Sequence, residues 1–128
     1  MVNVEDGYRM TVAEAVKFVD GQFFCGEDLA ADMEVVSACG SDLMSDVMAF
    51  VKDRVILLTG LVNPQVIRTA ELLDIRAIIF VRGKTPSRDM IEMAEEAEII
   101  LAGTKDPMFL SCGKLYVAGL QAGSIRAF

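Results

Sequence analysis

Apolar residues along the chain fall alternately into short continuous runs and into stripes at helical spacing. The runs within Val55–Thr59, Ala77–Val81 and Glu98–Ala102 have the length of buried strands, and a Gly or a charged residue follows each of them. A β-branched stretch, Glu34–Ala38, predicts a further strand. Between the runs, apolar side chains recur every three or four residues, as on one face of a helix. The helices predicted in this way cover residues 12–19, 43–51, 63–74, 87–97 and 106–118.

Three of these helices have recognisable start signals. Thr11 with Glu14 three residues later is a capping-box pattern. Asn63 and Asp106 each precede a proline, which is favoured in the first helical turn. Gly119 is placed to end the last helix. Of the remaining segments, residues 22–25 are a short aromatic stretch of strand length and residues 27–32 a polar connection.

From residue 35 onward, strands and helices alternate, which is the pattern of a largely parallel sheet with helices on both faces. The sequence therefore predicts a three-layer α/β/α fold with a mostly parallel sheet of about four or five strands. It contains no internal repeat, linker or low-complexity segment. We expect one domain over residues 1–128, with its core over about 10–120 and a short C-terminal tail over 121–128.

Composition narrows the classes of partner. The 128 residues include 19 acids and 12 bases, a net charge of −7, which opposes binding to nucleic acid. No apolar run approaches the ~18 residues of a membrane-spanning helix, and the first ten residues lack the pattern of a signal peptide. Cys25, Cys39 and Cys112 are odd in number and form no CxxC motif, which predicts reduced thiols in the cytoplasm.

Several catalytic classes lack their key residues. The chain contains no histidine, which excludes His-dependent triads and removes the commonest general base. Residues 82–85, RGKT, resemble the end of a phosphate-binding loop. The first glycine of that loop would have to stand at position 78, which is occupied by isoleucine. A response-regulator receiver needs an acceptor aspartate where this chain has Thr59. We therefore assign no catalytic residue, metal or cofactor.

The carboxyl ends of the predicted strands form a candidate ligand site. These ends are Cys39–Asp42, Thr59–Asn63, Arg82–Thr85 and Gly103–Asp106, and each combines Gly with Ser, Thr or a charged residue. Ligands of parallel sheets bind at this edge, where helix N-termini also favour anions. The alternative interpretation is that strand-to-helix turns need glycine and capping residues in any case.

A doubled Ser-Asp motif carries most of the candidate side chains. Ser41 and Ser45, like Asp42 and Asp46, are four residues apart, so they share one helix face. Ser41 as an N-cap and Asp42 in the first turn would explain the first pair, whereas capping does not explain Asp46. The residues that we predict to bind a ligand are Ser41, Asp42, Ser45, Asp46, Thr59, Gly60, Asn63 and Gly83.

The same region resembles a known family. Residues 32–48 read DMEVVSACGSDLMSDVM, which is similar to the signature of DRTGG domains, D-R-x-V-T-G-G followed by S-D-L-L-S-D-V-M. The second half of that signature is almost fully matched, and Asp32 and Val35 match in the first half. The chain departs from the signature at Met33, Val36, Ser37 and Ala38. The resemblance in layout extends over about residues 10–120.

The resemblance implies a fold related to the N-terminal domain of HPr kinase/phosphorylase, without its kinase activity, which resides in a separate domain. DRTGG domains occur alone or attached to phosphate acetyltransferases and to CBS-containing regulatory pyrophosphatases. The family is thought to be regulatory and to form dimers. What the resemblance implies for this chain is thus a regulatory domain that is not catalytic.

Three functional hypotheses follow. The first is a non-catalytic regulatory homodimer that senses a small ligand at the strand ends. The second is a nucleotide- or anion-binding sensor in which Ser41, Ser45 and Thr59 contact phosphate. The third is an enzyme that uses Cys39 or the pair of aspartates.

Overall fold

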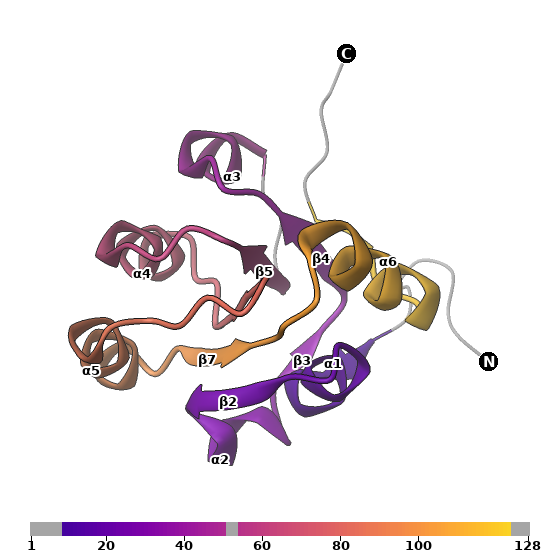
Figure 1. Ribbon diagram of the computed structural model, residues 1–128, viewed down its shortest axis with the longest axis horizontal. Coiled ribbons are helices and arrows are strands. Elements are labelled where there is room, and N and C mark those ends of the chain that lie inside the picture. Colours follow the sequence, from indigo (N-terminus) through magenta and orange to yellow (C-terminus); the bar gives the residue numbers. More distant parts are fainter. Residues whose placement is uncertain (1–8, 51–53, 124–128) are drawn as a thin grey trace.

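The continuous apolar runs of the sequence form the middle of one six-stranded sheet in the computed structural model, which describes residues 9–50 and 54–123 (Figure 1). The strand order is β2-β7-β6-β5-β4-β8, and β1 pairs separately with β3. The strands are β1 Met10–Thr11, β2 Gln22–Cys25, β3 Glu34–Val35, β4 Ser37–Gly40, β5 Val55–Thr59, β6 Ala77–Phe80, β7 Ile100–Gly103 and β8 Gln121–Ala122. The helices are α1 Val12–Phe18, α2 Glu27–Ala30, α3 Met44–Phe50, α4 Pro64–Leu72, α5 Arg88–Ala97 and α6 Met108–Ala118.

Helices cover both faces of the sheet, which confirms the predicted three-layer fold with a mostly parallel sheet. Strands β4, β5, β6 and β7 run parallel, and β2 lies antiparallel beside β7. Side chains along β5 point alternately to the two faces, so Ile56 and Leu58 pack with α1 and α6, whereas Leu57 packs with α3, α4 and α5. All residues of β5, β6 and β7 are buried, as expected for strands covered on both faces.

Side chains cap three of the helices: Thr11 and Asn63 as predicted, and Ser87, whose capping role was not predicted. The Thr11 hydroxyl accepts from the Glu14 N–H at 3.1 Å, and the Glu14 carboxylate accepts from the Thr11 N–H at 2.9 Å. The Asn63 side chain accepts from the N–H of Gln65 at 2.8 Å. The Ser87 hydroxyl accepts from a backbone N–H in the first turn of α5 at 3.2 Å. These bonds satisfy amides that have no partner within the helix.

Three local predictions were wrong or incomplete. The segment predicted as a connection contains the single-turn helix α2, which follows Gly26 in a left-handed conformation at φ 80°. The predicted strand Glu34–Ala38 is divided between β3 and β4. Residues predicted as tail form β8, because Gln121 and Ala122 pair with the open edge of β4. Residues 1–8, the predicted helix end at Val51 and the tail over 124–128 lie outside the described residues.

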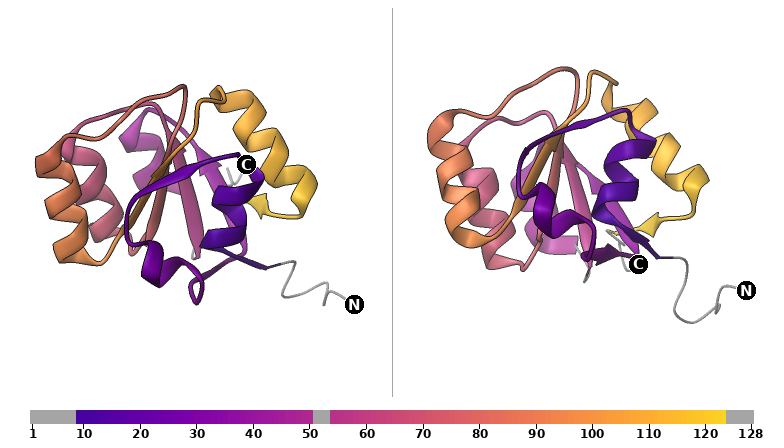
Figure 2. Two further views of the ribbon diagram at one scale, coloured as in Figure 1. Left: turned by 60° about the horizontal axis from the view of Figure 1, so that its bottom comes forward. Right: turned by 90° about the horizontal axis from the view of Figure 1, so that it is seen from below.

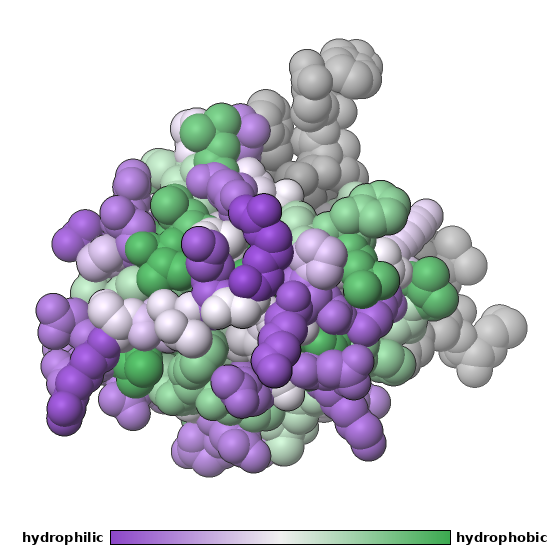
Figure 3. Space-filling view, viewed as in Figure 1, coloured by the Kyte–Doolittle hydropathy of each residue, from purple (hydrophilic) through white to green (hydrophobic). Residues whose placement is uncertain are grey.

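Helix α6 presents an apolar face to solvent (Figure 3). Phe109 is 90% exposed and Val117 is 89% exposed, and the exposed Tyr116 lies on the same side of the helix, two turns after Phe109. The opposite face of α6 is anchored by the buried residues Ser111 and Leu115. Within residues 9–50 and 54–123, no helix is long and apolar enough to cross a membrane.

Candidate functional site

The loops that follow the parallel strands meet along one edge of the sheet (Figure 2). Thr59 of β5 lies level with Phe80 of β6, and Phe80 lies level with Gly103 of β7. The polar residues that come directly after these positions are therefore neighbours in space, although they are far apart in sequence. This is the edge at which the sequence predicts a ligand site.

Asp42 connects the loop after β4 to the end of β5. Its carboxylate oxygen Oδ1 accepts from the Gly60 N–H at 2.6 Å and from the Thr59 hydroxyl at 3.1 Å. Thr59 is fully buried, and its hydroxyl also accepts from the Leu61 N–H at 3.1 Å. Asp42, Thr59 and Gly60 thus lie together at the strand ends and are hydrogen-bonded to one another, and their role in binding a ligand stays a prediction.

Ser41 and Asp42 do not cap α3 in the predicted way. The Ser41 hydroxyl accepts from the Leu43 N–H at 3.0 Å, but α3 begins only at Met44. That bond therefore closes a turn before the helix. Asp42 faces β5 instead of the first helical turn, because charge-assisted bonds from a backbone amide and a hydroxyl are available there.

The other predicted residues have separate surroundings. Asn63 caps α4, as described above. Ser45 and Asp46 are exposed on α3, and neither lines a described pocket. Their assignment to a ligand site stays a prediction. Gly83 alone among the eight candidates lines one of the described pockets.

The RGKT segment forms a tight turn. Arg82 and Gly83 both have left-handed backbone conformations, with φ of 57° and 72°, and the Lys84 N–H donates to the Val81 carbonyl at 3.2 Å. The N–H groups of Arg82 and Gly83 donate to carbonyls of the neighbouring loop, at Asp106 (2.9 Å) and Thr104 (2.8 Å). Because these amides already have partners, they cannot form the amide cradle of a phosphate-binding loop.

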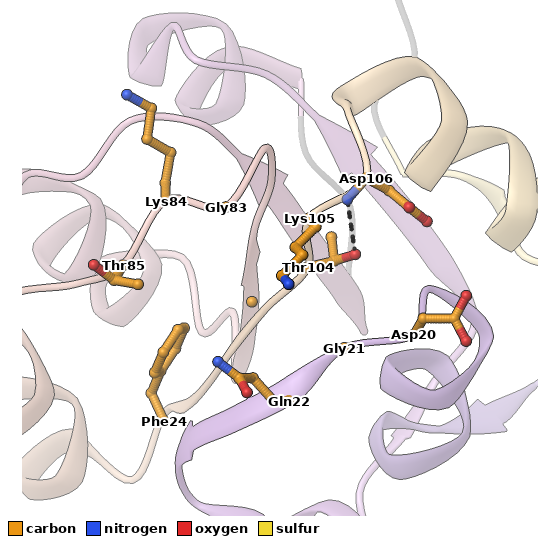
Figure 4. A pocket seen from close by; sticks show the side chains of 11 residues that line it. Asp20, Gly21, Gln22, Phe24, Gly83, Lys84, Thr85, Thr104, Lys105 and Asp106 are labelled. Carbon is orange, nitrogen blue, oxygen red and sulfur yellow. Dashed lines mark hydrogen bonds between the residues drawn. The ribbon is translucent and has the colours of Figure 1, made fainter.

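An open pocket of about 610 Å³ lies beside this turn, between β2 and the loops that follow β6 and β7 (Figure 4). In Figure 4 the side chains of Gln22 and Lys105 lie near its middle, Phe24 and Thr85 lie on one side, and Lys84 extends outward from the rim. Its lining consists of Asp20, Gly21, Gln22, Phe24, Gly83, Lys84, Thr85, Gly103, Thr104, Lys105 and Asp106.

Glycine at position 103 lets the floor of this pocket form. A Cβ on Gly103 would lie 2.6 Å from Cε2 of Phe24, a separation that real Cβ atoms do not show. Gly103 also meets Gly21, whose Cβ would lie 2.9 Å from the Gly103 carbonyl oxygen. The two small residues therefore allow β2 to pack closely on β7, with the Phe24 ring resting on Gly103.

Some of the charged side chains around the pocket form ion pairs and others do not. Lys114 contacts the carboxylates of Asp106 at 2.6 Å and of Asp20 at 3.3 Å. The hydrogen bond with Asp106 is the main reason why the pKa of Lys114 lies above its ordinary value. Among the described residues, Lys84 and Lys105 form no ion pair, and both are exposed. Lys84, Lys105 and Lys114 carry three positive charges against the two negative charges of Asp20 and Asp106, so the pocket with its ion pairs has a net charge of +1. Lys84 and Lys105 are the two ammonium groups that can pair with an anion.

Asp106 therefore differs from its predicted role as a helix cap. The helix begins after Pro107, which provides no side-chain cap. The Asp106 carboxylate pairs instead with Lys114, eight residues later in α6. The Asp106 N–H instead donates to the Thr104 hydroxyl at 3.1 Å, and that hydroxyl donates to the Val19 carbonyl at 2.6 Å. These bonds hold the loop after β7 against the end of α1.

The cysteines do not form a reactive thiol site. Cys39 is 4% exposed and is packed among apolar side chains. Burial raises the pKa of the thiols of Cys25 and Cys112, which lowers the fraction of thiolate at neutral pH. Within the part of the chain that the structure describes, no group of three or more His, Cys, Asp or Glu residues is placed to hold a metal ion.

Comparison with known proteins finds a similar fold among solved structures. No protein-family model and no curated protein sequence matches the chain. The fold resembles the crystal structure of the CBS and DRTGG domains in the regulatory region of a Clostridium perfringens pyrophosphatase, which was determined with its activator, diadenosine tetraphosphate. The TM-score is 0.64 at 14% identity, and the match covers 82% of this chain and 45% of that chain. The chain therefore has a DRTGG-like fold, as its signature region predicts.

Proposed function

We propose that this chain is a regulatory domain, not an enzyme, that senses a small ligand at the carboxyl edge of its sheet. The observation that supports this function best is the pocket beside β2, which has two unpaired ammonium groups and no activated nucleophile. The pyrophosphatase region with a similar fold is itself regulatory and is complexed with a nucleotide activator. That likeness supports a regulatory role here, with a nucleotide among the candidate ligands.

The proposal includes a homodimer in the cytoplasm. The exposed apolar face of α6 is the surface that we propose for the dimer contact, because Phe109, Tyr116 and Val117 would be removed from water there. Cytoplasmic residence is supported by Cys25 and Cys112, whose thiols form no disulfide.

A broad ligand screen tests the sensing role. Melting temperatures of the full chain would be measured with nucleotides, sugar phosphates, amino acids and dinucleotides. A true ligand raises the free energy of unfolding by about 2.7 kcal/mol at a hundredfold excess over Kd, and the rise depends on concentration. If no class of small molecule raises the melting temperature, the sensing role is refuted.

Light scattering after size exclusion tests the oligomeric state separately. We expect twice the chain mass of 13.9 kDa. A mass of one chain at tens of micromolar would refute the dimer without bearing on the ligand site.

A further inference from the structure

We propose that the pocket between β2 and the loops after β6 and β7 binds a phosphorylated ligand of nucleotide size. In this assignment Lys84 and Lys105 hold the phosphate groups, and the Phe24 ring supports the base. The inference rests on the proposed sensing role, and it names both the place of the site and the chemical class of its ligand. The place differs from the Ser-Asp motif, where the sequence analysis located a phosphate contact.

The charges favour an anion at this place. The chain carries a net charge of −7, so a pair of unpaired lysines at one pocket is a local reversal of the overall sign. The two acids of the lining do not fully cancel this reversal, because Lys114 offsets one of their two negative charges and leaves a local net charge of +1. Phosphate oxygens can accept hydrogen bonds from both ammonium groups, and such charge-assisted bonds are the strong ones.

The geometry of the loops leaves room for the phosphate. A Cβ added at Gly83 would meet no atom within 4 Å, so the backbone of the tight turn is open to close approach by a ligand. Lys84 follows that turn directly, and its flexible stem allows its ammonium group to turn from the rim toward the pocket. Thr85 and Gln22 add neutral donors to the same space.

Size and the aromatic wall indicate that the ligand is larger than inorganic phosphate. A volume of about 610 Å³ falls in the range of pockets that hold small organic molecules and cofactors. Phe24 lies on the side of the pocket away from Asp20 and Asp106, and Lys105 lies near the middle, so an aromatic ring and an ammonium group border the same space (Figure 4). The contact with Gly103 fixes the Phe24 ring in place before a ligand arrives.

The rim around Asp42 is less suited to an anion. The Asp42 carboxylate would repel a phosphate, and the Gly60 amide and the Thr59 hydroxyl already donate to that carboxylate. The nearest cation to Gly60 is Arg82, with a guanidinium nitrogen 3.9 Å from an ideal Cβ at that position. The Asp42 carboxylate lies at least as close to that position, 3.5 Å away, so the field of Arg82 is partly offset there for an approaching anion.

Calorimetric titration of the full chain with ADP, pyrophosphate and adenosine tests the inference. We expect ADP to bind most tightly and adenosine most weakly, with affinity for ADP falling as salt is raised. The double variant K84A/K105A should weaken ADP binding by at least about tenfold. Phe24→Leu should weaken ADP binding by about tenfold but leave pyrophosphate binding nearly unchanged, since pyrophosphate has no ring to stack.

A matched control separates a specific site from net charge. The double variant K17A/R68A also removes two exposed cations, neither of which lines the pocket, so it should bind ADP like the unchanged chain. Equal loss of affinity in K17A/R68A and K84A/K105A would overturn the site, as would undiminished binding by K84A/K105A. Folding of every variant is checked by its melting temperature, and the lysine variants are expected to fold because both positions are exposed.

The outcomes for this pocket and for the sensing role are distinguishable. If none of the three probes binds the unchanged chain, the phosphorylated-ligand assignment is refuted. The sensing role then still stands if the broader screen finds a ligand of another class. If ADP binds but the lysine variant binds it equally well, the chain is a nucleotide sensor whose site is elsewhere.

Discussion

The doubled Ser-Asp motif gives the most informative stability prediction. Asp42→Ala removes the acceptor of two hydrogen bonds, from the Gly60 N–H at 2.6 Å and from the Thr59 hydroxyl at 3.1 Å. A hydrogen bond to a charged group contributes about 1.5–3 kcal/mol. Since Asp42 is exposed to solvent, we expect a total loss of about 1–2 kcal/mol, well below the sum of two such bonds.

Asp46→Ala is the matched control, because the same residue type lies four positions later in the same repeat. Asp46 is exposed in the first turn of α3, where its charge interacts favourably with the helix dipole. Its removal should cost about 0.5 kcal/mol. Asp42→Asn, which keeps one amide oxygen as acceptor, should fall between the two alanine variants.

Urea denaturation followed by circular dichroism measures these differences as shifts of the unfolding midpoint at constant m-value. The expected order of stability is Asp46→Ala above Asp42→Asn above Asp42→Ala. Equal losses for the two alanine variants would refute the assignment of Asp42 as the connection between the loops. A ligand titration of the same variants adds a second readout, since Asp42→Ala should leave ADP binding unchanged.

Three further predictions concern packing, charge and association. Gly103→Ala should destabilise the fold by about 1–3 kcal/mol, because the added methyl group would collide with Phe24. Gly113→Ala should stabilise the fold slightly, because its methyl group meets no atom within 4 Å and alanine favours the helix. Equal urea midpoints for the two variants would contradict this prediction. The pKa of Lys114 is raised in the folded chain, so its stabilisation is present below the ordinary lysine value of 10.5 and is lost as pH rises through the higher folded value. Lys114→Met should therefore remove part of the alkaline loss of stability seen by thermal melting, and identical alkaline profiles would count against the ion pairs. Val117→Glu should convert the proposed dimer to a monomer in light scattering and remove the dependence of the melting temperature on protein concentration, and a persistent dimer would exclude this face of α6.

The centre of the fold could be predicted because its signals are local. The runs that became β5, β6 and β7 are continuously apolar and end at a glycine or a charged residue, which is what burial on both faces requires. Capping by Thr11 and Asn63 could also be predicted, since each side chain bonds to an amide two or three residues away. Strand β8 could not, because two residues of weak strand preference pair only when the edge of β4 is present.

The site was harder to predict because its contacts join distant segments. Asp42 has the sequence position of a helix-capping acid, and nothing local shows that its carboxylate reaches Gly60, 18 residues later. Phe24 and Lys105 line one pocket only because β2 lies antiparallel beside β7. The sequence features that could have indicated this pairing are Gly21 and Gly103, because two residues without side chains allow β2 and β7 to pack closely.

The most direct test of whether the ligand binds at the carboxyl edge beside β2 is an NMR titration. The amide chemical shifts of the isotope-labelled chain would be followed as ADP is added. We expect the largest shifts, and saturable ones, at Gly21, Gly83 and Lys105, with little change at Gly60. Shifts centred on Gly60 and the first turn of α3 would refute this assignment and place the ligand site at the doubled Ser-Asp motif.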